Sequence, residues 1–207
     1  MNFHKFRLEL KEFPVFSLID VKKLSEKIYH HRLVEWQKNG YIERVGNGVY
    51  KFSEVMLDEL KLFYIANKLY MPSYVSLETA FSYYGFIPET VTIITSVSSK
   101  KTTTFRTKYA TFSYRTIKKS LMFGYKIISS DNLNFKIAES EKAVLDFLYL
   151  HSELNSIDHI DELRINADNF EEKIDREKLN NYSILFENKN LNKRLNLLLD
   201  WIEDAKS

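Results

Sequence analysis

Few residues of this chain have types and spacings suited to chemistry. The nearest approach to a catalytic cluster is a set of charged residues close together in the sequence: Glu139, Glu141, Lys142 and Asp146. Such a set could belong to a nuclease. However, Glu141 and Lys142 are neighbours, so on a helix their side chains point about 100° apart. We therefore favour a plain amphipathic helix with a charged outer face over a catalytic site.

Other catalytic patterns are missing from the sequence. It has no glycine-rich phosphate loop, no paired histidines of the His-Glu-x-x-His type and no serine in a nucleophile-elbow pattern. The five histidines have no spacing that suggests a metal site, and there are no cysteines to form disulfides, thiolate metal sites or a thiol nucleophile. We expect no enzymatic activity, metal or cofactor.

A basic helix and the hairpin after it give the strongest functional signal. Residues 1–52 hold ten Lys and Arg against six Asp and Glu. A helix fits the major groove of DNA, and residues of an adjoining hairpin commonly contact phosphates. The candidate DNA contacts are Lys22, Lys27, His30, His31, Lys38, Arg44 and Asn47. The alternatives are a merely solvated basic face and a helix-and-hairpin module that binds protein.

A second basic surface is predicted between positions 90 and 130. This span contains eight Lys and Arg, no Asp or Glu, and interleaved aromatic residues, a mixture that suits nucleic acid or an acidic partner. The alternative is a charged sheet edge that blocks strand pairing. Its basic residues are Lys100, Lys101, Arg106, Lys108, Arg115, Lys118, Lys119 and Lys126. Residues 151–207 hold eight basic and thirteen acidic residues, so a polyanion should meet the first two thirds of the chain.

The elements that carry the first basic surface can be predicted from local patterns. Pro14 ends an N-terminal helix, and Ser17 with Asp20 forms a capping box for a short second helix. A third helix covers 26–39. Asn47 and Gly48 favour a type I′ hairpin. Helix, helix, helix and hairpin is the order of a winged helix-turn-helix, which we place in residues 1–52.

Residues 53–207 are expected to form a mixed α/β domain, so the predicted fold class is α+β. Ser53 should cap a long helix over 54–70, and Ser76 a second one that Gly85 ends. A sheet should occupy about 91–137, with helices after 139 and a helical C-terminal end. The predicted strands are 91–96, 103–107, 110–117, 121–129 and 134–137. There is no secretory signal and no membrane-spanning stretch, so we expect a cytoplasmic protein.

Several segments resemble AbiEi-type antitoxins of bacterial abortive-infection systems. The most specific are 72–89, which reads PSYVSLETAFSYYGFIPE, and 138–149, which reads AESEKAVLDFLY. The segments 92–97 (TIITSV), 123–125 (FGY) and 40–50 (GYIERVGNGVY) are similar to further parts of that family. The family segments draw attention to six residues: Ser76, Glu78, Thr79, Glu141, Lys142 and Asp146.

The resemblance implies a DNA-binding transcriptional autorepressor that recognises inverted repeats in its own promoter. It also implies a type IV antitoxin, which counteracts a nucleotidyltransferase-like toxin without forming a stable complex. The alternative functions are a nucleic-acid-processing enzyme of nuclease type and a winged-helix protein-interaction module.

Overall fold

The N-terminal unit, residues 1–52, is a small helical bundle closed by a three-stranded sheet. The structure is a computed structural model of the whole chain and describes residues 1–88, 92–130 and 132–205. Strand β1 pairs with β3, and β3 pairs with β2, all antiparallel. The elements are α1 (Phe3–Glu9), β1 (Val15–Ser17), α2 (Leu18–Val21), α3 (His30–Lys38), β2 (Ile42–Gly46) and β3 (Val49–Phe52).

Aromatic rings fill the core of this unit. Phe6 packs against Phe16 and Trp36 with ring centroids 5.4 and 4.6 Å apart. Phe52 contacts Phe16 at 5.1 Å. Burial of such large rings supplies most of the stabilising apolar area in a unit this small.

Local signals in the N-terminal unit are partly confirmed. The capping box is present: the Ser17 amide donates to Asp20 at 2.8 Å, and the Ser17 hydroxyl accepts from the Asp20 amide at 3.3 Å. The type I′ turn is wrong, because Gly48 has a positive φ and Asn47 does not. The third helix begins at His30 rather than at position 26, so Lys27 precedes it.

The larger unit, residues 53–205, is built on a mixed six-stranded sheet. The strand order is β6-β7-β5-β4-β9-β8. Strands β5 with β7 and β4 with β9 are parallel, and the other neighbours are antiparallel. The strands are β4 (Ser73–Val75), β5 (Ile93–Ser98), β6 (Thr103–Arg106), β7 (Thr111–Thr116), β8 (Tyr125–Ser130) and β9 (Leu133–Ala138).

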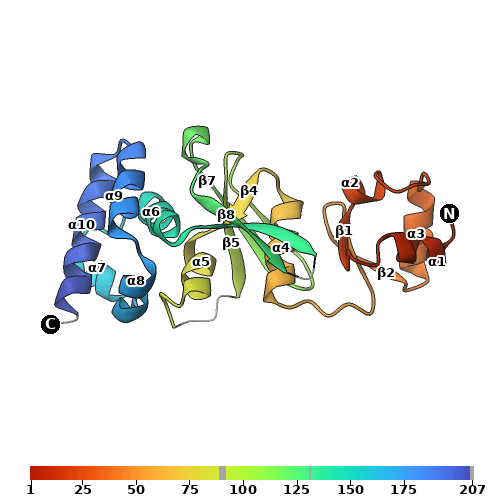
Figure 1. Cartoon of the computed structure of the whole chain (residues 1–207), viewed down its shortest axis with the longest axis horizontal. Coiled ribbons are helices and arrows are strands. Elements are labelled where there is room, and N and C mark those ends of the chain that lie inside the picture. Colours follow the sequence, from red (N-terminus) through yellow and green to blue (C-terminus); the bar gives the residue numbers. More distant parts are fainter. Residues whose placement is uncertain (89–91, 131, 206–207) are drawn as a thin grey trace.

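Helices cover both faces of this sheet. Helix α4 lies on the face toward the N-terminal unit, and α5 and α6 lie on the other (Figure 1). The C-terminal helices pack outside α6, so the molecule is elongated, with α3 and α10 at opposite ends (Figure 1). The helices are α4 (Glu59–Leu69), α5 (Leu77–Tyr84), the 3-10 turn η1 (Lys119–Leu121), α6 (Ser140–Leu150), α7 (Ile157–Asp161), α8 (Ala167–Lys173), α9 (Arg176–Leu185) and α10 (Lys189–Asp204).

Two predicted boundaries in the larger unit differ from the structure, and a third falls outside the described residues. Helix α4 is capped by Asp58, not Ser53, because the Asp58 carboxylate accepts from the Lys61 amide at 2.9 Å. The strand predicted to begin at 121 begins at Tyr125, after η1. Position 91, where the first strand was predicted to begin, lies outside the described residues, as does Glu89 of the segment 72–89.

The N-terminal unit has its own core around Phe6 and Trp36, but one face of its sheet belongs to the core of the larger unit. Val15, Val45 and Val49 of the N-terminal sheet are buried in the same cluster as Phe63 and Leu69 of α4. The change of sequence pattern near residue 53 therefore does not coincide with a gap in the packing. Among the described residues, no helix combines the length and apolar character needed to cross a membrane.

Candidate functional site

The exposed face of α3 presents several predicted DNA contacts together. His30, His31 and Lys38 are exposed, and they line an open hollow of about 470 Å³ on this helix. Lys27 is exposed just before the helix, with its ammonium 5.1 Å from the centre of the Tyr29 ring. That ring is itself 57% exposed and stacks on His31 at 5.9 Å, so an aromatic surface adjoins the cations.

The cations of this face are not neutralised by the protein's own acids. Within the described part of the chain, Lys22, Lys27, Lys38 and Arg44 form no ion pair, and all four are exposed. The one acid of the hollow, Glu35, is held by Arg32 at 2.7 Å. We call the surface formed by Lys27, His30, His31 and Lys38 the α3 face; Lys22 lies outside it, at the end of α2.

The hairpin beside α3 is docked on the larger unit. The Asn47 side-chain amide donates to the Leu69 carbonyl oxygen at 3.3 Å, at the end of α4. A Cβ built at Gly46 would lie 3.1 Å from a Leu69 methyl and 3.5 Å from a Thr107 methyl. Asn47 was predicted as a DNA contact; it is exposed, but its amide already has a partner inside the protein.

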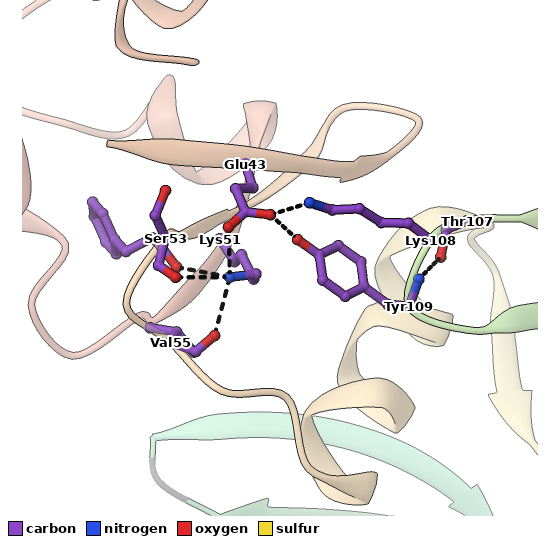
Figure 2. A network of polar contacts seen from close by, with 8 residues as sticks. Glu43, Lys51, Ser53, Val55, Thr107, Lys108 and Tyr109 are labelled. Carbon is purple, nitrogen blue, oxygen red and sulfur yellow. Dashed lines mark hydrogen bonds and ion pairs between the residues drawn. The ribbon is translucent and has the colours of Figure 1, made fainter. Parts of the chain in front are cut away.

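A polar network joins β2 of the hairpin to the turn between β6 and β7 (Figure 2). The Glu43 carboxylate accepts hydrogen bonds from the Lys108 ammonium and the Tyr109 hydroxyl across this junction. It also accepts from Lys51 at 3.3 Å. These donors, Lys108 foremost, lower the pKa of Glu43 to about 2. We call Glu43, Lys51, Lys108 and Tyr109 the junction network.

Lys51 is the buried member of the junction network, with 4% of its surface exposed. Its ammonium donates to the carbonyl oxygens of Phe52, Ser53 and Val55 at 3.3, 3.2 and 3.0 Å (Figure 2). A buried ammonium needs such partners, because losing hydration costs several kcal/mol. The sequence offers half of this network, since Glu43 and Lys51 are opposite each other in the hairpin register, but no local pattern indicates Lys108 or Tyr109.

The second basic span does not form one surface. Lys100 and Lys101 follow β5, and Lys118 and Lys119 follow β7. The ends of these two strands are paired, and the Thr116 hydroxyl donates to the Lys100 carbonyl at 2.7 Å, so the four lysines lie at one end of the sheet. These four exposed lysines form what we call the lysine cluster. Lys108, by contrast, is held by Glu43.

The other basic residues of the span lie apart from the lysine cluster. Arg106 is exposed at the opposite end of β6, and Lys126 is exposed on β8. Arg115 is half-buried on β7. The pKa of Glu153 is lowered mainly by a backbone hydrogen bond and by His151, and the charge of Arg115 makes a smaller contribution.

The charged residues of α6 face inward. Glu141, Lys142 and Asp146 are 3%, 0% and 0% exposed, so the expected charged outer face is wrong. Lys142 and Asp146 form an ion pair, and the Tyr74 and Ser76 hydroxyls each donate to Asp146 at 2.9 Å. Burial lowers the pKa of Lys142, and the charge of Asp146 opposes that shift. The sequence of a helix shows which residues are charged, but not whether they contact solvent or pair with one another inside the fold. The predicted charged outer face was wrong for this reason.

Partners inside the fold also occupy Ser76, Glu78 and Thr79. Ser76 is the N-cap residue of α5, as predicted, but its hydroxyl bonds Asp146 and makes no cap hydrogen bond to the helix. The Thr79 hydroxyl donates to the Ile93 carbonyl at 3.1 Å. The Glu78 carboxylate lies 3.4 Å from Nε2 of His151. The predicted C-terminal cap is confirmed, since Gly85 has φ 70°.

A second group of charges surrounds Glu141 where α9 packs against α6. Glu141 accepts from the Asp175 amide at 3.0 Å and lies 3.4 Å from the Lys178 ammonium. Lys178 also pairs with Glu139 at 3.2 Å, and Glu139 accepts from the Tyr182 hydroxyl at 2.7 Å. These contacts attach α9 to α6, and they use the acids that a nuclease would need for metal.

Comparison with known proteins adds no relative. No model of a known protein family matches the chain, and no curated protein has a matching sequence. Across the described ranges, no three histidine or acidic side chains are grouped so that they could hold a metal ion.

Proposed function

We propose that this chain is a bacterial transcriptional autorepressor that binds double-stranded DNA through a winged helix formed by residues 1–52. The observation that carries the proposal is the α3 face, where exposed cations without ion pairs lie on α3 and on the segment just before it. A major groove admits such a helix, and unpaired cations gain most from phosphates because no internal partner must be given up.

The arrangement of the N-terminal unit supports this assignment. Its order of helix, strand, helix, helix and hairpin, with β1 beside β3, is the order found in winged helices. The docked hairpin modifies the usual scheme, because Asn47 is bonded to Leu69. We therefore assign the main DNA contacts to the α3 face, with Arg44 as the hairpin residue that contacts phosphate.

We further propose that the protein is the antitoxin of a type IV toxin–antitoxin pair acting in the cytoplasm. Support comes from the segments 72–89 and 138–149, which resemble AbiEi-type antitoxins. The partner would be a nucleotidyltransferase-like toxin encoded nearby, counteracted without a stable complex. The lysine cluster is the surface to which we assign antitoxicity, because four exposed cations favour a polyanion such as RNA or an acidic partner.

The nuclease alternative gains no support from the burial of its candidate residues. Lys142 and Asp146 have no exposed surface on which a substrate could bind. We therefore propose that the protein has no catalytic activity of its own.

The test of DNA binding compares matched lysine variants on DNA from upstream of the gene. Lys27→Ala combined with Lys38→Ala should weaken binding and reduce the slope of log affinity against log salt by roughly 0.9 for each lost phosphate contact. Lys189→Ala combined with Lys193→Ala, which removes two exposed lysines of α10, is the control and should change neither quantity. An unchanged slope in the first variant would show that the α3 face does not touch DNA, and would favour a protein-binding winged helix.

A further inference from the structure

A cavity is lined by residues of α10. Helix α10 lies at the end of the molecule opposite α3 (Figure 1). The cavity has a volume of about 610 Å³ and lies between the exposed side of α10 and the turn that follows α6. Pockets that hold small molecules have about 300–1,000 Å³, so this volume suits one such ligand. We call it the α10 cavity; its polar lining includes Ser152, Asn155, Asn190, Lys193, Arg194 and Asp200.

Arg194 is the unusual residue of this lining, because it is an arginine with only 7% of its surface exposed. Its Nε donates to the Leu148 carbonyl at 2.7 Å, which fixes the guanidinium beside the end of α6. Its two terminal nitrogens make no hydrogen bond or ion pair to any described residue. Burial lowers the pKa of Arg194, and the charge of Glu153 opposes that shift without forming an ion pair. The remaining N–H donors of Arg194 are thus available to a ligand in the cavity.

The other residues of the lining favour an anion with a polar body. Lys193 is exposed at the cavity and has no ion pair in the described ranges, while Asp200 is the one acid of the lining. The side chains of Ser152, Asn155 and Asn190 can donate and accept hydrogen bonds, and all three residues are exposed. Two cations against one acid leave the lining with a charge of +1.

The start of α10 does not itself supply the donors. The Asn188 side chain accepts from the amides of Asn190 and Leu191, at 3.0 Å each. These first-turn N–H groups already have a partner, so recognition in the α10 cavity rests on side chains.

We propose that the α10 cavity binds a small anionic molecule through a carboxylate or phosphate group. The terminal nitrogens of Arg194 accommodate the two oxygens side by side, as guanidinium groups do with planar or tetrahedral oxyanions. The Lys193 ammonium adds a third donor, and the asparagines bind the polar remainder. Asp200 disfavours ligands with a second negative group at that end. Because the cavity is remote from the α3 face, ligand and DNA can be bound together.

Titration calorimetry of the full chain at fixed ionic strength tests this, with inorganic phosphate, adenosine monophosphate and succinate as separate probes. We expect saturable 1:1 binding of at least one probe, and the strongest binder distinguishes a phosphate source from a carboxylate source. Absence of saturable binding by all three below about 10 mM overturns the proposal.

Variants place the bound anion. Lys193→Glu should weaken binding at least about tenfold, since a charge-assisted hydrogen bond contributes about 1.5–3 kcal/mol. Lys189→Glu, the same change on the same helix outside the cavity lining, should leave affinity within about twofold. Lys193 is preferred to Arg194 here because Arg194 also holds Leu148, and its loss could unfold the protein. Equal affinities in Lys193→Glu and the wild type, or loss of binding only in Lys27→Ala with Lys38→Ala, would show that the anion binds elsewhere.

Discussion

Lys142 and Asp146 lie one helical turn apart on α6 and form an ion pair in which neither side chain has any exposure to solvent. The Lys142 ammonium also donates to the Tyr74 hydroxyl at 2.8 Å, and that hydroxyl donates to Asp146 at 2.9 Å. The aromatic rings of Phe123 and Phe186 lie 5.2 and 5.0 Å from the ammonium. The pair therefore joins α6 to β4 inside the core, and neither charge is available for another task.

Removing one charge of this pair should be severe. Lys142→Met leaves Asp146 buried without its counter-ion, and we expect the free energy of unfolding to fall by about 3–5 kcal/mol. Lys142→Met with Asp146→Leu should recover part of that loss, since no uncompensated charge remains. Urea denaturation measures both, with exposed Lys118→Met as the control, expected within about 0.5 kcal/mol of wild type. A loss no larger than the control's would contradict the buried pair.

Acid should weaken the junction network through Glu43. Its pKa is lowered to about 2 from the ordinary 4.5, so its contribution to stability is complete above 4.5 and is lost as the pH falls toward 2. Urea midpoints measured at pH values through that window should fall more steeply in the wild type than in Glu43→Gln. Glu162→Gln, an exposed carboxylate with no ion pair among the described residues, should behave like the wild type. Parallel curves for Glu43→Gln and the wild type would contradict the network.

His151 should give the opposite pH dependence. Glu78 foremost, and then Glu153, raises the pKa of His151 above 6.5, and the imidazole stacks on Phe147 at 4.3 Å. The stabilisation is therefore complete below 6.5 and is lost as the pH rises through the raised pKa. In the wild type, the free energy of unfolding should therefore decline as the pH rises through the raised pKa of His151, and His151→Gln should remove this contribution to the decline. The exposed His4→Gln is the matched control, and an equal decline in both variants would count against the pair with Glu78.

Reversing the lysine cluster should separate the two proposed activities. Replacing Lys100, Lys101, Lys118 and Lys119 by Glu should abolish protection of cells that express the partner toxin, because the surface becomes repulsive to a polyanion. Promoter repression should persist, since the α3 face is unchanged. Reversal of Lys189 and Lys193 serves as the control and should leave protection intact. Protection that survives the fourfold reversal would mean that the lysine cluster is only a solvated surface.

A fragment that begins at Ser53 should be much less stable than the whole chain. The cut removes Val15, Val45 and Val49, and exposes the apolar surface of α4 that they cover. We expect a lower thermal midpoint and increased binding of a hydrophobic dye. A fragment with an unchanged midpoint would show that the shared core contributes little.

Local signals predicted much of this fold, and long-range packing explains most of what they missed. The capping box at Ser17 and the left-handed Gly85 depend on neighbouring residues only, and both were predictable. The burial of Lys142 depends on Tyr74, 68 residues away, and no periodicity within α6 reveals it. The helical spacing of Tyr29, Leu33 and Trp36 predicts that all three lie on one face; Leu33 and Trp36 are buried, whereas Tyr29 precedes α3 and is 57% exposed. The sequence alone could not show that Lys108 lies apart from the lysine cluster, because this depends on the order and pairing of the strands.

The docking of the hairpin on the larger unit also limits how residues 1–52 could be exchanged for another DNA-binding unit, during evolution or in the construction of chimeras. A terminal DNA-binding module is usually replaced as a cassette, joined by a linker that tolerates any neighbour. Here a replacement for residues 1–52 would have to bring its own counterparts of Glu43 and Asn47, or it would leave Lys108, Tyr109 and the end of α4 without partners. Under the proposed function, changes of DNA specificity are therefore expected to arise by substitution on the α3 face, while the hairpin and the surface on which it docks stay unchanged.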